Sequence, residues 1–293
     1  MNGSWKIVMQ HISSVAKTKV TLLKREMIAG GCINQCYKVT DSNHKQWFIK
    51  TNSSTLIEMF IAESKGLNEI ANSQSIRSPK SICYGLTKDF SYLVLEFISL
   101  KPLSSQIKMG KELAKMHQTT GKYFGWSRNN TIGSTPQSNQ KNSNWASFWK
   151  DHRLLFQLNL ALKNGYPPKA YEDGLKLAEN CHLFFSNYNV KPSLLHGDLW
   201  GGNAACDSNG NPIIFDPAVY YGDRETDIAM TELFGGFSND FYVSYNQYYA
   251  LDKDYTTRKN LYNLYHILNH FNLFGGGYAS QSHNIVTELL RHV

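Results

Sequence analysis

Hydrophobic and polar residues in the first hundred positions follow two periods, one typical of strands and one of helices. Residues 5–17 predict a short helix, and apolar residues recur at helical spacing over 55–72, where Leu56, Phe60 and Leu67 share one face. β-prone runs bounded by turn residues predict strands over 20–29, 36–40, 46–50, 81–86 and 91–98. The order of three strands, a helix and two strands predicts a small antiparallel sheet with one helix packed on it.

Beyond Ser99 the pattern becomes mainly helical. We predict helices over the ranges 104–120, 145–163, 170–187, 225–235, 238–250, 256–274 and 282–292. Segment 121–144 is rich in Gly, Asn, Ser, Thr and Gln and is expected to be a long loop, which in a compact domain is often functional. The change of pattern predicts an α+β fold with two lobes, a sheet lobe over 1–98 and a larger, mostly helical lobe over 99–293.

Composition narrows the class of protein only slightly. The chain of 293 residues is 42% hydrophobic and 18% charged, which is ordinary for a soluble globular protein, and its net charge is +7. A basic balance can indicate nucleic-acid binding, but the Lys and Arg residues are scattered and no basic run exceeds two. We therefore expect no nucleic-acid partner, and instead a cationic site that attracts nucleotide phosphates.

Cysteine usage and the lengths of apolar runs bear on the compartment. The five cysteines are irregularly spaced and form no CxxC, so they indicate neither a zinc site nor a disulfide framework. A reducing cytoplasmic location is the simplest expectation. The N-terminus lacks the apolar core of a signal peptide, and no run of about 18 apolar residues is present, so no membrane segment is expected.

The most informative stretch of the chain is HGDLWGGN, from His196 to Asn203. Asn203 lies at the start of a predicted hairpin, whose turn is the run DSNGNP, and Asp216 lies at its end. Facing positions in a hairpin lie about 5 Å apart, so the amide oxygen of Asn203 and the carboxylate of Asp216 can share one Mg²⁺ ion. Asp198 lies outside the hairpin and is free to orient and deprotonate an acceptor hydroxyl. The set predicts phosphoryl transfer from a magnesium nucleotide.

The His-Gly-Asp sequence by itself has an ordinary explanation. It arises by chance, and an aspartate in a turn usually caps a helix or the turn itself. The complete set of Asp198, Asn203 and Asp216 at these spacings favours catalysis over that explanation.

Two features of the predicted sheet lobe suit a nucleotide. Gly30, Gly31 and Asn34 lie between the first two strands, where glycines let backbone N–H groups approach phosphates, although most Gly-Gly pairs simply form turns. Lys50 ends the third strand, and Glu63 lies on the apolar face of helix 55–72, where a buried carboxylate needs a cation. We therefore expect an ion pair that positions Lys50 for phosphates. The alternative is a glutamate at the edge of the apolar face that reaches water.

Together these segments resemble the fructosamine/ketosamine kinase family, which shares the protein-kinase-like fold with aminoglycoside and choline kinases. The resemblance covers most of the chain and rests on HGDLWGGN, IIFDPAVYYGDRETDIAMTELFGGF, NNTIGSTPQSN, the Trp145–Arg153 stretch and LYHILNHFNLFGGGY. His-Gly-Asp with a downstream Asp is shared by many small-molecule kinases. HGDLWxGN with DPAxYYG and LFGGF is far more specific.

The resemblance implies a bilobal protein-kinase-like fold and an enzyme that uses ATP and Mg²⁺ to phosphorylate the 3-hydroxyl of ketosamines. The phosphorylated adduct would then decompose and free the amine. The partner would be a small sugar-amine or a glycated lysine on a protein, and the chain would be a monomer or a weak homodimer. Matching positions would carry three roles: the base at Asp198, the metal ligands at Asn203 and Asp216, and the ion pair at Lys50 and Glu63.

The resemblance also carries expectations for positions around these motifs. Backbone groups of residues 96–98 (Glu96, Phe97 and Ile98) would meet the adenine. Asp227 would accept backbone N–H bonds from the catalytic loop. Two positions depart from the family, with Gly201 where Ser is common and Asp223 where His is common. Gly201 is expected to add only flexibility, and Asp223 to add negative charge near the site and shift the sugar preference.

Several residues keep two interpretations. Trp200 packs either on the acceptor or in the core. The resemblance places His270 near the sugar pocket, and with His266 it forms an i, i+4 pair that could bind a metal but has no evident third ligand. The segment Thr131–Gln137 either walls the acceptor site or closes a loop. Cys32, in the phosphate loop, is either inert or, as in some family members, a redox switch that acts through an intermolecular disulfide.

Two other functions stay open at this point. One is a kinase of another small hydroxyl compound, such as an aminoglycoside or choline, because the 3-hydroxyl acceptor rests on resemblance alone and a fold is a weak guide to substrate. The other is an inactive nucleotide-binding scaffold, against which the filled catalytic positions argue.

Overall fold

The computed structural model describes residues 3–28 and 33–293, which divide into two compact units. Unit 1 comprises the described residues up to Ser105 together with Ala205–Pro217, and unit 2 comprises Gln106–Ala204 and Ala218–Val293. The predicted boundary at residue 98 lies inside unit 1, and the hairpin segment groups with the N-terminal residues. None of the described helices has the length and apolar character needed to cross a membrane. Gly30, Gly31 and Cys32 lie outside the described residues.

The centre of unit 1 is an antiparallel sheet of five strands in the order β1-β2-β3-β5-β4. The strands are β1 Leu22–Ile28, β2 Gln35–Asp41, β3 Gln46–Asn52, β4 Ser81–Leu86 and β5 Ser91–Glu96. All five lie within a few residues of the predicted ranges, because each is a run of six or seven residues, long enough to be recognised as a strand between turn residues.

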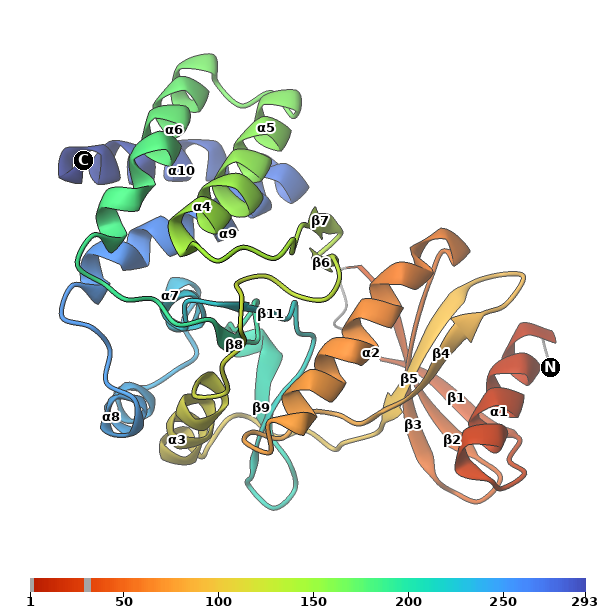
Figure 1. Ribbon diagram of the computed structural model, residues 1–293. Coiled ribbons are helices and arrows are strands. Elements are labelled where there is room, and N and C mark those ends of the chain that lie inside the picture. Colours follow the sequence, from red (N-terminus) through yellow and green to blue (C-terminus); the bar gives the residue numbers. More distant parts are fainter. Residues whose placement is uncertain (1–2, 29–32) are drawn as a thin grey trace. The chain divides into compact units, whose positions relative to one another are not determined.

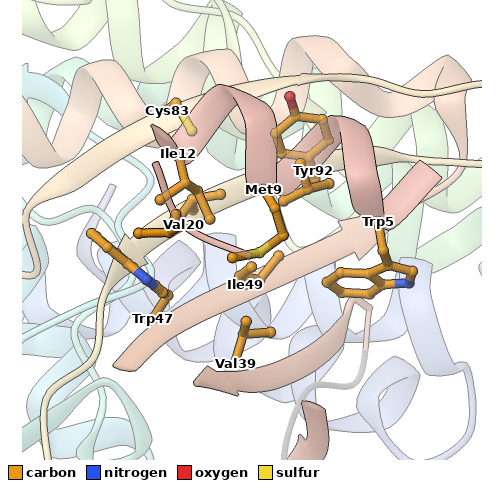
Figure 2. Close-up of a cluster of buried hydrophobic side chains, with 11 residues drawn as sticks. Trp5, Met9, Ile12, Val20, Val39, Trp47, Ile49, Cys83 and Tyr92 are labelled. Carbon is orange, nitrogen blue, oxygen red and sulfur yellow. The ribbon is translucent and has the colours of Figure 1, made fainter. Parts of the chain in front are cut away.

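Two helices cover opposite faces of this sheet (Figure 1). Helix α1 (Gly3–Ala16) buries Trp5, Met9 and Ile12 against residues of β2, β3 and β5, as Figure 2 shows. Helix α2 (Ile57–Asn72), preceded by a short 3₁₀ turn, packs Phe60 and Leu67 on the other face. The sequence predicted both helices, but it predicted that only the helix over 55–72 packs on the sheet. The structure shows that α1 packs on the sheet as well.

The predicted hairpin is present and completes unit 1. It consists of β9 (Ala204–Cys206) and β10 (Pro212–Ile214), and Asp207 begins its turn by accepting the backbone N–H groups of Asn209 and Asn211. Arg77 Nη1 donates to Asp207 at 2.6 Å, and the backbones of Lys101 and Cys206 exchange two hydrogen bonds. These contacts attach the hairpin to the segments on either side of β4 and β5.

Unit 2 is mainly helical and is built around α9 (Tyr255–Phe274), whose residues are mostly buried. The other helices are α3 Gln106–His117, α4 Trp145–Trp149, α5 Leu155–Lys163, α6 Pro168–Asn180, α7 Glu225–Leu233, α8 Asn239–Tyr248 and α10 Tyr278–Leu289. A π-helical turn, Lys150–Leu154, joins α4 to α5, and short 3₁₀ turns follow α6 and α10. These elements match the predicted helices, with the range 145–163 divided by the π-helical turn.

Two small antiparallel ladders in unit 2 were not predicted. Strand β8 (Ser193–Leu195) pairs with β11 (Tyr220–Gly222), and β6 (Asn130–Ile132) pairs with β7 (Thr135–Gln137). The segment 121–144 is therefore not a loop throughout, because it contains the β6–β7 hairpin.

Candidate active site

Lys50 is the centre of a charged cluster in unit 1. It lies on β3, two residues after Phe48 and hence on the face that α2 covers. Its Nζ donates to Glu63 Oε1 at 2.7 Å and also to the carboxylate of Asp216. The Lys50 and Glu63 side chains are 4% and 10% exposed, whereas that of Asp216 is 50% exposed. The predicted ion pair is confirmed, and the alternative in which Glu63 reaches water is wrong.

The environment of Lys50 keeps its ammonium group charged. Burial alone would lower the pKa of Lys50, but the carboxylates of Asp216 and Glu63 outweigh it and raise the pKa above its ordinary value. A permanently charged donor next to a half-exposed carboxylate can meet phosphate oxygens and a metal ion.

Asp216 has an unusual backbone conformation. Its φ of +57° lies in the left-handed region, which is uncommon for residues other than glycine. Such conformations persist where the surrounding structure enforces them, and they gather at functional sites. Here the conformation occurs two residues after the end of β10, and the carboxylate accepts a hydrogen bond from Lys50.

A mainly apolar pocket of about 200 Å³ lies beside this cluster in unit 1. Its lining residues are Ile28, Cys36, Phe48, Pro79, Leu95, Glu96, Ile98, Leu100, Phe215 and Asp216. Apolar walls that end at a charged group suit a flat base with phosphates attached. Of the residues expected to meet the adenine, Glu96 and Ile98 line the pocket, whereas Phe97 is not among its lining residues and has Lys38 Nζ 4.6 Å from its ring centre.

Asn34 lies near the start of β2, but its side chain is already engaged. Its Oδ1 accepts a hydrogen bond of 2.8 Å from Asn52 Nδ2, which also donates to the Ile33 carbonyl. The side chain of Asn34 therefore fastens the residues that precede β2 to the end of β3.

In unit 2, the loop that carries Asp198 is held from two sides. The carboxylate of Asp227 accepts the backbone N–H groups of His196 and Gly197 at 2.7 and 2.8 Å, as the sequence predicted. On the other side, Ala218 N donates to His196 O at 2.8 Å. Gly197 has φ +82°, and a Cβ there would lie 2.2 Å from Ala218 O. Only glycine fits this position.

Asn203 is fixed to the same loop. Its Nδ2 donates to the backbone O of Asp198 at 2.8 Å and lies 3.3 Å from Oδ2 of the same residue. This hydrogen bonding uses the amide nitrogen and leaves the amide oxygen as the group that can bind a cation. The donor set of Asn203 therefore fits Mg²⁺, which prefers oxygen ligands.

A buried histidine supports Asp227. His117, on α3, has its Nε2 3.1 Å from Asp227 Oδ2 and its Nδ1 2.8 Å from the hydroxyl of Tyr245 on α8. Burial lowers the pKa of His117. A neutral imidazole that donates to Asp227 can accept from Tyr245, so both ring nitrogens are satisfied.

Five aromatic side chains of unit 2, which we call the aromatic shelf, are joined by ring contacts: Trp200, Phe234, His270, Phe274 and Tyr278. Trp200 contacts Phe234, Phe234 contacts His270, and His270 contacts both Phe274 and Tyr278. Trp200 is 41% exposed, so the alternative that places it in the core is wrong. His270 Nδ1 donates to His266 O at 2.8 Å, and burial lowers the pKa of His270. Its Nε2 is consequently an unprotonated acceptor.

A model of the fructosamine kinase family matches residues 4–292. The chain belongs to the fructosamine kinase family. It is 43% identical over 290 residues to a probable ketoamine kinase of Synechocystis, covering 98% of this chain and 97% of that protein. It is also 41% identical over 280 residues to the chloroplastic protein-ribulosamine 3-kinase of Oryza sativa subsp. japonica, covering 94% of this chain and 80% of that protein.

Solved structures agree with this assignment. A protein of Haemophilus somnus 129PT, provisionally described as a fructosamine-3-kinase, is 28% identical, with a TM-score of 0.90 and coverage of 98% of each chain. The choline kinase LicA of Streptococcus pneumoniae has a TM-score of 0.66 at 17% identity, covering 98% of this chain and 99% of that one, a likeness of fold alone. The predicted family, the protein-kinase-like fold and the kinase class are confirmed.

Two positions that depart from the family pattern have surroundings that the sequence does not indicate. Asp223 is 1% exposed and accepts hydrogen bonds from the hydroxyls of Tyr188 and Tyr262, and its expected effect on the sugar preference stays a prediction. Gly201 does more than add flexibility, because a Cβ there would lie 2.9 Å from the carbonyl oxygen of Gly235. The absence of a side chain at Gly201 lets the loop at Gly235 and Gly236 approach the loop that carries Asp198.

Within the described residues, no three His, Cys, Asp or Glu side chains gather as a metal site, so the pair His266 and His270 has no third ligand of these types there. His266 is buried, which lowers its pKa to about 3. Sequence reasoning missed His117 and Arg153 as supports of the site. In the sequence, each of these two residues is only a polar position within an apolar pattern. Such a pattern indicates burial but does not identify the residue that the side chain contacts.

Proposed function

We propose that this member of the fructosamine kinase family transfers the γ-phosphoryl group of ATP to the 3-hydroxyl of a ketosamine. The observation that carries the proposal is the cluster of Lys50, Glu63 and Asp216 at the charged end of an apolar pocket. That arrangement suits a nucleotide, and the relatives named for ketoamine and ribulosamine kinase activity support the acceptor.

The nucleotide end of the reaction belongs to unit 1. The adenine occupies the apolar pocket, where backbone groups next to Glu96 and Ile98 meet its edge. Lys50 donates to the phosphates, and Glu63 holds it in place so that its long side chain keeps one geometry. Gly30 and Gly31, outside the described residues, are proposed to cover the phosphates through their backbone N–H groups.

Asp216 and Asn203 are the proposed ligands of Mg²⁺. Asp216 supplies a half-exposed carboxylate. Asn203 supplies its amide oxygen, because its hydrogen bonds to Asp198 use only the amide nitrogen. When bound, Mg²⁺ would offset the negative charge of the phosphates. Asn203 precedes the β9–β10 hairpin and Asp216 follows it, so the distance between the two proposed ligands depends on the register of that hairpin.

Asp198 is the proposed base. It accepts the proton of the acceptor hydroxyl while that oxygen bonds to the γ-phosphorus and the bond from the γ-phosphorus to the oxygen that bridges it to the β-phosphate breaks, leaving ADP. Asp227 and Ala218 fix the backbone before Asp198, and this holds the carboxylate in one position. Positioning and proton transfer are thereby combined in one side chain.

The aromatic shelf is the proposed acceptor surface. The exposed face of Trp200 can pack on the sugar ring, and His270 Nε2 can accept a hydrogen bond from a sugar hydroxyl. The shelf is open to solvent, with Phe274 62% exposed, so it suits both a free sugar-amine and a glycated lysine on a protein.

The test is ADP release by the parent and by an Asp198→Asn variant, with ribulosyl-lysine, fructosyl-lysine, an aminoglycoside and choline as acceptors. We expect turnover of the first two by the parent. In the variant, the rate should fall by at least ~10²-fold while ATP affinity is retained. Activity on only the aminoglycoside or choline would show a different acceptor class. A near-parental rate in the variant would contradict the role of Asp198, and ATP binding without turnover of any acceptor by the parent would favour a scaffold.

A further inference from the structure

Gln137, on β7, is a buried side chain that the proposed mechanism does not use. It is 1% exposed, and all its polar groups are engaged within unit 2. Its Nε2 donates to the carbonyl oxygen of Ala218 at 3.1 Å and to Oδ1 of Asn130 at 2.9 Å. Its Oε1 accepts from the hydroxyl of Tyr265, on α9, at 2.7 Å. One side chain thus joins β6, α9 and the backbone at residue 218.

Ala218 is the residue on which the catalytic loop lies. Its N–H donates to the carbonyl oxygen of His196, and its own carbonyl lies against Gly197. Asn130 Nδ2 donates to the next carbonyl, that of Val219, at 2.8 Å. The β6–β7 hairpin therefore holds two successive carbonyls of the segment that leads into β11 and supports residues 196 and 197, directly before Asp198.

Arg153, in the π-helical turn, fastens the end of this hairpin. It is fully buried, and its Nη1 and Nη2 donate to Ser138 O at 2.6 Å and to Asn139 Oδ1 at 2.8 Å. Its guanidinium carbon lies 4.2 Å from the centre of the Tyr220 ring. Within the described part of the chain it makes no ion pair with a carboxylate. A buried cation without such a partner is costly, and the hydrogen bonds from Nη1 and Nη2 to residues 138 and 139 offset part of that cost.

We propose that Gln137 is a positioning residue for Asp198, acting through Ala218, and that Arg153 keeps the β6–β7 hairpin in the place this requires. The inference rests on the proposed function for its kinetic consequences. It gives the end of the segment Thr131–Gln137 a structural role, and the expectation that this segment walls the acceptor site stays a prediction.

The main test is a Gln137→Glu variant, which keeps the size of the side chain and the acceptor for Tyr265 but loses both N–H donors. The carboxylate then faces the carbonyl oxygen of Ala218 and repels it. We expect kcat with the preferred ketosamine to fall by about tenfold or more, because small displacements of a catalytic group are costly. KM for ATP should stay within about twofold, because the nucleotide-binding residues are unchanged.

Hydrogen exchange of the segment 216–220 gives a readout that is independent of activity. The N–H of Ala218 is bonded to His196 O, so its exchange should accelerate in Gln137→Glu more than that of backbone N–H groups elsewhere in unit 2. Unchanged kcat, or a fall in kcat without faster exchange at Ala218, would overturn the proposal. A parent enzyme that fails to phosphorylate any ketosamine would overturn the proposed function instead, and the exchange result would still decide the support of the loop.

A matched pair of tyrosine variants covers the case in which Gln137→Glu does not fold. Tyr265→Phe removes one hydrogen bond from Gln137, whereas Tyr166→Phe removes an equally buried hydroxyl that bonds Ser282 on α10. We expect a several-fold fall in kcat and faster exchange at Ala218 for Tyr265→Phe only. Equal effects of the two variants on both readouts would overturn the proposal.

Discussion

At the scale of single residues, Gly197 combines two constraints that exclude other residues. An alanine there would combine a left-handed backbone with a Cβ 2.2 Å from the carbonyl oxygen of Ala218. The backbone term alone is about 1–2 kcal/mol, and the clash displaces the loop that carries Asp198. We expect Gly197→Ala to reduce kcat by about 10²-fold, measured by ADP release.

Gly165→Ala is the matched control for this prediction. Gly165 also has a positive φ, of +87°, but no atom lies within 4 Å of the place that a Cβ would occupy. The Gly165→Ala variant should unfold at a somewhat lower urea concentration than the parent and keep the parental kcat. If the two variants lose the same fraction of activity, the close approach to Ala218 is not what makes Gly197 necessary.

The sequence predicts residue identities at the site better than residue surroundings. The Lys50–Glu63 pair follows from a carboxylate on an apolar helix face, since burial requires a partner. The contact between Gln137 and Ala218 spans 81 positions, and no local pattern indicates a bond of that range. The burial of Asp223 escapes prediction for the same reason, because the tyrosines that enclose it are distant in sequence.

At the scale of elements, the packing of α3 on α8 depends on one glycine. A Cβ at Gly110 would lie 2.4 Å from the carbonyl oxygen of Phe241 and 2.9 Å from the backbone N of Tyr245. Because these are backbone atoms, one helix has to move. We expect Gly110→Ala to lower the free energy of unfolding by about 1–3 kcal/mol in a urea titration.

The control for this helix contact is Gly277→Ala, since Gly277 has φ −63° and no atom lies within 4 Å of a Cβ there. That variant should unfold at the parental urea concentration. An equal loss in both variants would show that α3 and α8 adjust to the added methyl group. His117 and Tyr245 connect the same two helices, so the Gly110 variant should also lower kcat by loosening the support of Asp227.

Element length decides how much of the fold can be predicted. The strands of the main sheet have six or seven residues, and the major helices nine or more, so their periods are visible in the sequence. Strands β6, β7, β8 and β11 have three residues each, too few for an alternating pattern. The composition around β6 and β7 therefore predicts a loop, although this segment carries the buried Gln137.

At the scale of the whole molecule, buried neutral histidines make stability depend on pH. Burial lowers the pKa of His266 to about 3 and also lowers that of His117. In the unfolded chain both titrate near ~6.5. Between the two values the unfolded state binds more protons, so stability is complete above pH ~6.5 and declines as the pH falls toward the folded pKa values. Urea unfolding between pH 7 and pH 4 should show this slope.

A His266→Asn variant should flatten that slope by up to about 1.4 kcal/mol per pH unit, the value for one proton. The exposed His292, in the last 3₁₀ turn, provides the control, and His292→Asn should keep the parental slope. A parental slope in His266→Asn would show that the acid sensitivity comes from other groups.

The discontinuity of unit 1 has a consequence for synthesis on the ribosome. The first 105 residues are translated well before Ala205–Pro217. That later segment supplies the backbone hydrogen bonds to Lys101 and Arg77, and it also supplies the Asp216 carboxylate that lies beside Lys50. At bacterial or eukaryotic elongation rates the wait lasts on the order of ten seconds. During that interval the nascent sheet has a buried lysine without its second counter-charge, and the chain has to stay soluble until translation reaches the insertion that completes it.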